Sequence, residues 1–281
     1  MPVSTRKRPP LGVMQGRLLP KYQGRYQAHP VGYWQKEFHL AADLGLDCIE
    51  FILDFNDASE NPLMTKKGVE EILTLGEATG VTVLSVCADY FMEAPLHSDD
   101  SEIVTESRKV LQALIENGKE LKLTDIVMPC VDQSSLKTAK SAESFYHNLV
   151  PFLDSAEKHK INISLETDLA PEPFAELIRR FDSRRVTVNY DIGNSAALGY
   201  DTAEELKCYG DKISDIHIKD RLLGGGPVPL GTGNAKFDDF FAALKPLNYA
   251  GHFIMQAYRD DEGIEIFKQQ LNWLRERKYL E

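Results

Sequence analysis

Apolar residues gather in eight short runs along this chain, and amphipathic segments separate several of them. The runs lie at 11–15, 47–52, 81–87, 124–129, 161–166, 185–191, 213–218 and 251–256. Most are rich in β-branched or other apolar residues and lack a polar residue at every second position, which is typical of strands buried on both faces. The pattern therefore predicts eight buried strands.

The intervening segments with helical periodicity lie at 34–45, 68–80, 106–122, 141–160 and 237–247. Gly45 and Gly80 each follow such a segment and precede a strand, as a glycine that ends a helix does. Eight strands in alternation with helices favour a single closed (β/α)8 TIM barrel, an α/β fold. A doubly wound open sheet is the alternative, but the G-x-G-x-x-G loop expected after its first strand is missing.

The length of 281 residues fits one such barrel, since barrels of this type typically need ~250 residues. We assign residues 11–281 to the barrel, as the catalytic domain, and residues 1–10 to a flexible N-terminal tail. The tail is basic, but no apolar segment typical of a signal peptide follows it. No apolar stretch approaches the ~20 residues of a membrane span. We therefore expect a cytoplasmic protein that does not bind membranes.

Charge and cysteine usage narrow the classes of partner. The net charge of −11 argues against nucleic acid as a ligand. The four cysteines, Cys48, Cys87, Cys130 and Cys208, are scattered and form no C-x-x-C motif, so we expect reduced thiols. A G-x-x-x-x-G-K-[ST] motif is missing, and we expect no nucleotide cofactor.

Four polar residues lie at the ends of consecutive strand-like runs in the C-terminal half. They are Glu166, Asp191, His217 and Gln256, spaced by 25, 26 and 39 residues. The carboxyl ends of barrel strands converge on one mouth, and oxygen and imidazole donors there suit a divalent metal. Taken alone, each carboxylate is as well explained by capping the next helix, and the histidine by a hydrogen-bonded core position. Their coincidence favours one site for Mn²⁺, Co²⁺, Zn²⁺ or Mg²⁺, with the neutral Gln256 the weakest ligand.

Several motifs resemble the xylose-isomerase-like TIM barrel superfamily, specifically its sugar phosphate isomerase/epimerase branch. The motifs are MQGRL (14–18), LGLDCIEFILD (44–54), SLETD (164–168), YDIGNSAALGYD (190–201), DIHIKDR (215–221) and PLGTGNAKF (229–237). By this resemblance, Glu166, Asp191 and His217 correspond to three metal ligands, and Gln256 stands where the fourth, usually glutamate, lies. Asn194 stands where many members have a histidine.

The resemblance implies a divalent-metal-dependent isomerase or epimerase. Such an enzyme removes a proton next to the carbonyl of a keto-sugar or sugar phosphate and forms a metal-stabilised enediolate. Glu166 would be the general base, and Lys219, which alternation places on the face of His217, is a second catalytic candidate. The family's epimerases use two glutamates on opposite faces of the substrate carbon. Because Gln256 replaces one of them, the sequence favours one-base isomerisation over 3-epimerisation.

Other polar residues near the predicted mouth are candidates for further roles. Candidates for the second acid or base, besides Lys219, are Asp220, Glu50, His252 and Cys87, although His252 is expected at the opposite end of its strand. Candidates for binding the sugar are Gln15, Arg17, Glu50, Asn194, Asp220 and Arg221. The glycine-rich segment 222–237 could bind phosphate or serve as a structural loop. The resemblance also implies a homo-oligomer, either a dimer or a tetramer.

Three other functions remain open. A keto-sugar dehydratase would need the same base and an acid for the departing hydroxyl group. A non-catalytic sugar-binding barrel would explain the loss of family residues at Gln256 and Asn194. An endonuclease-IV-like DNA repair hydrolase normally needs a richer set of histidine ligands, whereas only His217 of the seven histidines is expected at the carboxyl end of a strand.

Overall fold

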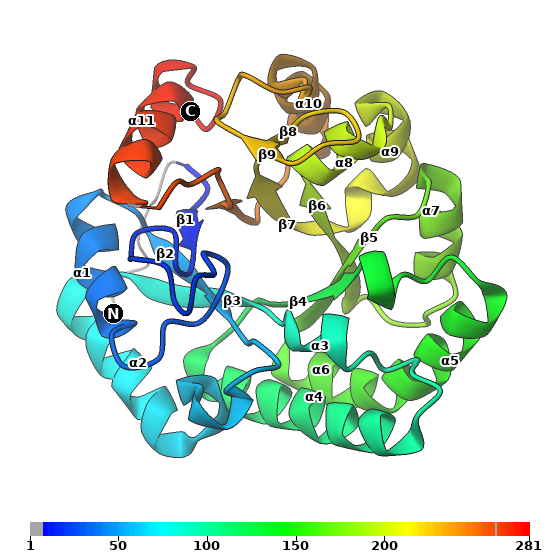
Figure 1. Ribbon diagram of the computed structural model, residues 1–281. Helices are drawn as coiled ribbons and strands as arrows, with labels where there is room; N and C mark the ends of the chain where they lie inside the picture. The colour runs from blue at the N-terminus through cyan, green and yellow to red at the C-terminus, as the bar shows by residue number, and fades with distance from the viewer. Residues whose placement is uncertain (1–7, 262) are drawn as a thin grey trace.

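Eight parallel strands close into a barrel in the computed structural model, which describes residues 8–261 and 263–281 (Figure 1). The strands are β1 (Leu11–Met14), β2 (Cys48–Ile52), β3 (Thr82–Cys87), β4 (Asp125–Cys130), β5 (Asn162–Thr167), β6 (Val186–Asp191), β7 (Ile213–Ile218) and β10 (His252–Met255). The order around the barrel follows the chain, and β10 pairs with β1 to close it. The predicted fold is thus confirmed. Residues 1–7 of the predicted tail lie outside the described part of the chain.

Helices form a ring around the strands (Figure 1). They are α1 (Gln35–Asp43), α2 (Lys66–Thr79), α3 (Tyr90–Glu93), α4 (Ser101–Leu121), α5 (Ala139–Leu149), α6 (Leu153–His159), α7 (Pro171–Arg179), α8 (Ile192–Leu198), α9 (Thr202–Tyr209), α10 (Phe237–Leu244) and α11 (Ile264–Glu276). Gly80 ends α2 with a φ of 76°, a left-handed conformation that glycine adopts without strain. The single helix predicted at 141–160 is wrong. A 3-10 turn at Val150–Phe152 separates α5 from α6, because Pro151 lacks the N–H that a continuous helix requires.

The main apolar core lies between the strands and the surrounding helices, where large side chains such as Phe38, Phe51 and Phe145 are fully buried. Inside the barrel a smaller apolar cluster is formed by Met14, Cys48, Ile52, Cys87, Val127 and Ile254. Much of the remaining interior is polar and includes Glu50, Ser85, Ser164, Asn189, Asp215 and His217. Buried polar groups are costly unless they are hydrogen-bonded. The polar part of the barrel interior is therefore the region in which we expect a functional site.

The glycine-rich segment after β7 is folded rather than loose. Two short strands, β8 (Asp220–Arg221) and β9 (Pro227–Val228), pair antiparallel at its start (Figure 1). The buried carboxylate of Asp220 accepts hydrogen bonds from the backbone N–H groups of Gly231, Gly233 and Ala235, at 2.9, 2.9 and 3.0 Å. Both carboxylate oxygens of Asp220, which was predicted to bind substrate, therefore accept hydrogen bonds that stabilise this loop.

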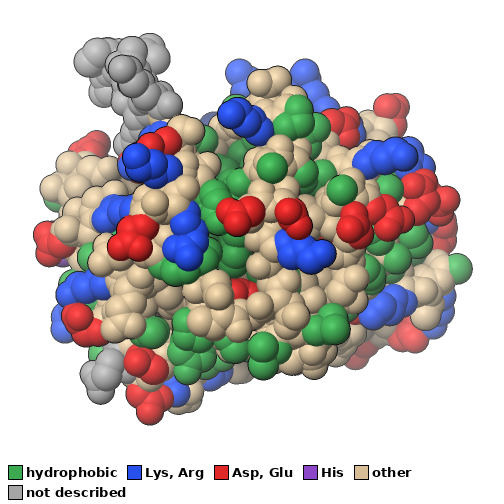
Figure 2. All heavy atoms as spheres, turned by 90° about the horizontal axis from the view of Figure 1, so that it is seen from above, with side chains coloured by type: hydrophobic (Ala, Val, Ile, Leu, Met, Phe, Trp, Pro, Cys, Tyr) green, Lys and Arg blue, Asp and Glu red, His purple; other side chains and the backbone are tan. Residues whose placement is uncertain are grey.

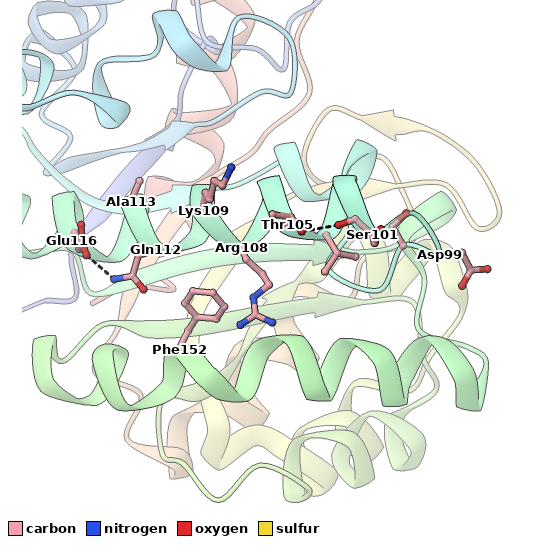
Figure 3. A pocket seen from close by; sticks show the side chains of 11 residues that line it. Asp99, Ser101, Thr105, Arg108, Lys109, Gln112, Ala113, Glu116 and Phe152 are labelled. Atoms are coloured by element: carbon pink, nitrogen blue, oxygen red, sulfur yellow. Dashed lines mark hydrogen bonds between the residues drawn. The ribbon is translucent and has the colours of Figure 1, made fainter.

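Acidic and basic side chains are interspersed over the side of the barrel seen in Figure 2, where neither sign forms a continuous patch. Across the described residues, every helix is too short or too polar to cross a membrane. The four cysteines are not joined in disulfides, and Cys48, Cys87 and Cys130 are buried. A groove of about 780 Å³ runs along the outer face of α4, where Arg108 lies over the ring of Phe152 (Figure 3). This groove is on the outer wall and contains none of the predicted site residues.

Candidate active site

The four predicted metal ligands lie together at the carboxyl ends of their strands. Asp191 ends β6, Glu166 and His217 are the penultimate residues of β5 and β7, and Gln256 directly follows β10. Their exposed fractions are 6%, 5%, 0% and 3%. The parallel register places Asp191 directly opposite His217, and Asp191 Oδ2 lies 3.9 Å from His217 Nδ1. Burial of this many polar side chains at one mouth requires partners for each of them.

Asp191 divides its two oxygens between structure and site. Oδ1 accepts the backbone N–H of Asn194 at 2.8 Å and caps α8. Oδ2 faces the mouth, where Lys219 Nζ donates to it at 3.2 Å. Helix capping, the alternative explanation for this carboxylate, is thus correct for one oxygen and leaves the other available for chemistry.

His217 offers one free nitrogen to the mouth. Its Nε2 lies 2.8 Å from Glu50 Oε1, whereas its buried Nδ1 has no hydrogen-bond partner. Burial lowers the pKa of His217, but the adjacent Glu50 outweighs this effect and raises the pKa to about 10, so a cation that binds Nδ1 displaces a proton from it. Two donors that each bind one cation at about 2.1 Å lie about 3–4 Å apart. The separation between Nδ1 and Asp191 Oδ2 fits that arrangement, and mixed nitrogen and oxygen donors suit each of the four predicted cations.

Lys219 enters the mouth on the same face as His217. Besides Asp191, its Nζ donates to Gln256 Oε1 at 2.9 Å. The ammonium group therefore partly neutralises Asp191 and holds the amide oxygen of Gln256. The amide nitrogen of Gln256 donates in turn to Gln27 Oε1 at 3.1 Å. A cation that took the Gln256 oxygen would have to displace the lysine from it.

Glu166 is held by an amide that has a fixed orientation. Arg221 Nη1 donates to Asn194 Oδ1 at 2.8 Å, so Asn194 must turn its nitrogen toward Glu166, whose Oε1 accepts that hydrogen bond. Burial raises the pKa of Glu166 to about 7, and the negative charge of Asp191 adds to the shift.

Gln15 and Arg17, which were predicted to bind substrate, make contacts within the protein. Gln15 Oε1 accepts hydrogen bonds from the backbone of Ile52 and from His29 Nδ1. The buried guanidinium of Arg17 donates to the backbone oxygens of Ala257 and Tyr26 at 3.0 Å each. These contacts fix the segment between β1 and α1 against the mouth.

Two residues of the mouth were not predicted. Gln27 lies in an irregular segment, and its Nε2 donates to Asp89 Oδ2 at 3.0 Å. Asp89 also accepts a hydrogen bond from Cys87 Sγ at 3.1 Å, and burial raises the pKa of its carboxyl group. Burial raises the pKa of Cys87 as well, which disfavours a thiolate there. The position of Asp89, two residues beyond the end of β3, is the signal that could have identified it.

The buried His29 makes the free energy of unfolding depend on pH. Burial lowers its pKa to about 4, so between that value and about 6.5 the unfolded chain binds the proton more tightly. Stability contributed by neutral His29 is therefore lost as the pH falls through this window, by about 3 kcal/mol in total. We expect His29→Gln to flatten the pH dependence of the free energy of unfolding, measured with urea between pH 7 and pH 4. The exposed His39→Gln should keep the wild-type slope; equal slopes in all three proteins would contradict the assignment.

A family model described as "Xylose isomerase-like TIM barrel" matches residues 38–277. The chain belongs to the xylose isomerase-like TIM barrel family. This confirms the resemblance derived from the strand-end motifs. The matched range includes all four strand-end residues, Glu166, Asp191, His217 and Gln256.

Several of the proteins that are similar to this chain are named as epimerases. The chain is 27% identical to a putative L-ribulose-5-phosphate 3-epimerase, SgbU, of Haemophilus influenzae, over 86% of this chain and 90% of that protein. It is 25% identical to the L-ribulose-5-phosphate 3-epimerase UlaE of Salmonella heidelberg, over 89% and 92% of the two chains. A D-psicose 3-epimerase structure determined in the presence of D-fructose shares the fold, with a TM-score of 0.76, 14% identity and coverage of 96% and 99%.

Proposed function

We propose that the protein is a divalent-metal-dependent epimerase that acts on the carbon next to the carbonyl of a keto-sugar or sugar phosphate. The observation that carries the proposal is the unpartnered His217 Nδ1, which faces Asp191 Oδ2 beside the base Glu166. The epimerase names of the relatives support the same reaction class. They also outweigh the preference for an isomerase that Gln256 alone suggested.

Asp191, His217, Glu166 and the amide oxygen of Gln256 would hold the cation. When bound, a divalent cation would polarise the carbonyl oxygen of the sugar and make the neighbouring C–H bond more acidic. Glu166 would accept that proton. The hydrogen bond from Asn194 reaches Oε1 of Glu166, and it orients the carboxylate.

Lys219 would supply the second proton on the opposite face. Epimerisation requires such a donor, and the amide of Gln256 cannot exchange a proton as a glutamic acid does. Lys219 Nζ lies 2.9 Å from Gln256 Oε1, which is the position at which the family's second carboxylate is expected. A cation bound to the Gln256 oxygen would displace the ammonium group of Lys219 from it, and the released group could then donate a proton to the sugar.

The proposal is tested by following product formation from L-ribulose 5-phosphate, D-psicose and D-tagatose by NMR. The full chain is first stripped of metal with a chelator and then supplied with Mn²⁺, Co²⁺, Zn²⁺ or Mg²⁺. We expect the 3-epimer of at least one sugar to form only in the metal-loaded samples. An aldose product would instead identify a one-base isomerase, and no conversion with any cation would contradict both forms of the proposal.

A further inference from the structure

A second cluster of polar residues lies inside the barrel beneath the candidate active site. Glu50 of β2, Ser85 of β3, Asp215 of β7 and His252 of β10 have exposed fractions of 0%, 0%, 0% and 3%. One donor atom each from Glu50, Asp215 and His252 lies within 4.8 Å of the others. The role proposed above for the mouth uses none of these four side chains.

The cluster is connected to the mouth through Glu50. One oxygen of Glu50 contacts His217 Nε2 at 2.8 Å, and the other accepts a hydrogen bond from Ser85 Oγ at 2.5 Å. Ser85 Oγ lies 3.1 Å from His252 Nε2, which is also 3.1 Å from Asp215 Oδ2. Both oxygens of Glu50 are therefore fixed, and the carboxylate can take only one orientation toward His217.

This connection spans the barrel interior. β2 and β7 are not neighbours, because β1 and β10 lie between them in the closed sheet. Backbone pairing therefore does not bring Glu50 to His217, and the contact depends on the two side chains reaching across the interior. Such a contact between fully buried groups is retained only where the partners satisfy each other.

Several donor atoms of this cluster already contact one another. Two carboxylates, Glu50 and Asp215, face two imidazoles, His217 and His252. The Nε2 atom of His252 already contacts Asp215 Oδ2 and Ser85 Oγ. The unpartnered nitrogen lies instead on His217, at Nδ1 on the mouth side of the ring.

We infer that Glu50 is a positioning residue that presents His217 Nδ1 to the metal, with Ser85 and His252 holding Glu50 in place. The inference rests on the proposed function. A carboxylate bound to the far nitrogen of a metal-ligating histidine fixes the ring and strengthens the other nitrogen as a ligand. Position 256 contributes a neutral amide where a charge is usual, so the negative charge behind His217 assumes part of the electrostatic role of the missing carboxylate.

The test is Mn²⁺ binding to the chelator-treated full chain, measured by titration calorimetry, with the nitrogen coupling of the bound Mn²⁺ measured by pulsed EPR. In Glu50→Gln we expect the Kd to rise by roughly 10–100-fold and the imidazole nitrogen coupling to weaken. Glu37→Gln is the matched control. Glu37 is also fully buried, but its carboxylate binds the backbone N–H groups of Gly16 and Leu18, so its Kd should stay within about twofold of the wild type.

The other possible results distinguish failure of this inference from failure of the proposed function. A Glu50→Gln variant that binds Mn²⁺ as the wild type does, with the same nitrogen coupling, overturns the inference and leaves the proposed function intact. A wild type that binds no Mn²⁺ overturns the proposed function itself. Two ions per wild-type chain, with one lost in Glu50→Gln, would show that the cluster binds metal directly and would also overturn the inference. If circular dichroism shows that Glu50→Gln does not fold, Ser85→Ala is measured instead. This change removes the hydrogen bond that holds Glu50 and keeps both Glu50 and His217. We expect a higher Kd for Mn²⁺, and an unchanged Kd would overturn the inference.

Discussion

Glu166→Gln is expected to lower kcat/KM by about 10³-fold, within the range that a positioned general base contributes. The amide keeps the size of the side chain and an oxygen that can accept the Asn194 hydrogen bond, but it cannot take a proton from carbon. Burial already penalises the ionised carboxylate, since it raises the pKa of Glu166 to about 7. The variant should therefore fold with an unchanged or slightly higher Tm.

The control for this variant is Glu205→Gln. Glu205 is another buried glutamate, but it lies on α9, and its carboxylate accepts hydrogen bonds from Tyr190, Ser195 and Tyr209. We expect this variant to lose stability and to keep its kcat/KM. Steady-state kinetics and thermal unfolding of both variants check the pair of predictions. Retention of more than a tenth of the wild-type kcat/KM in Glu166→Gln would exclude Glu166 as the base.

Asp191→Asn is expected to weaken metal binding by more than the ~10–100-fold typical of residues that act behind a ligand. Asparagine also caps helices well, so its side-chain oxygen should retain the hydrogen bond that Asp191 Oδ1 makes with Asn194 N–H. The change therefore removes the charge that faces His217 and Lys219 while preserving α8. Calorimetric titration with Mn²⁺ measures the effect.

Asp201→Asn provides a matched control, because Asp201 caps α9 through the backbone N–H of Glu204 at 3.0 Å and lies outside the mouth. Both variants should show similar, small changes in Tm, and only Asp191→Asn should lose affinity for Mn²⁺. Equal Mn²⁺ affinities in the two variants would limit Asp191 to the capping role.

The hydrophobic pattern predicted the barrel well because its strands are short, apolar and buried on both faces. Their boundaries agree with the prediction to within one residue at each end. The helix predicted at 141–160 was wrong because periodicity continues across Pro151, whereas the backbone hydrogen bonds cannot. The break between α5 and α6 is local, and it leaves the order of the strands unchanged.

The strand-end residues of the site could be predicted because parallel strands bring their carboxyl ends together. Gln27 could not, since it lies in a segment without periodicity, whereas Asp89 could have been recognised from its place two residues beyond the end of β3. The link between Glu50 and His217 also lies beyond sequence reasoning. It joins strands that are not neighbours, and the chain separates the two residues by 167 positions. His252 was expected at the end of its strand opposite the mouth, and it does begin β10.

Whether this mouth performs metal-assisted proton abstraction is decided by solvent deuterium exchange into ketoses and ketose phosphates, with and without Mn²⁺. We predict that the wild type incorporates deuterium next to the carbonyl, that a chelator abolishes incorporation, and that Glu166→Gln shows none. Label at C3 would identify an epimerase, and label at C1 or C2 an isomerase. Incorporation that persists without metal or in Glu166→Gln would contradict the mechanism, as would its absence from every sugar in a protein that binds Mn²⁺.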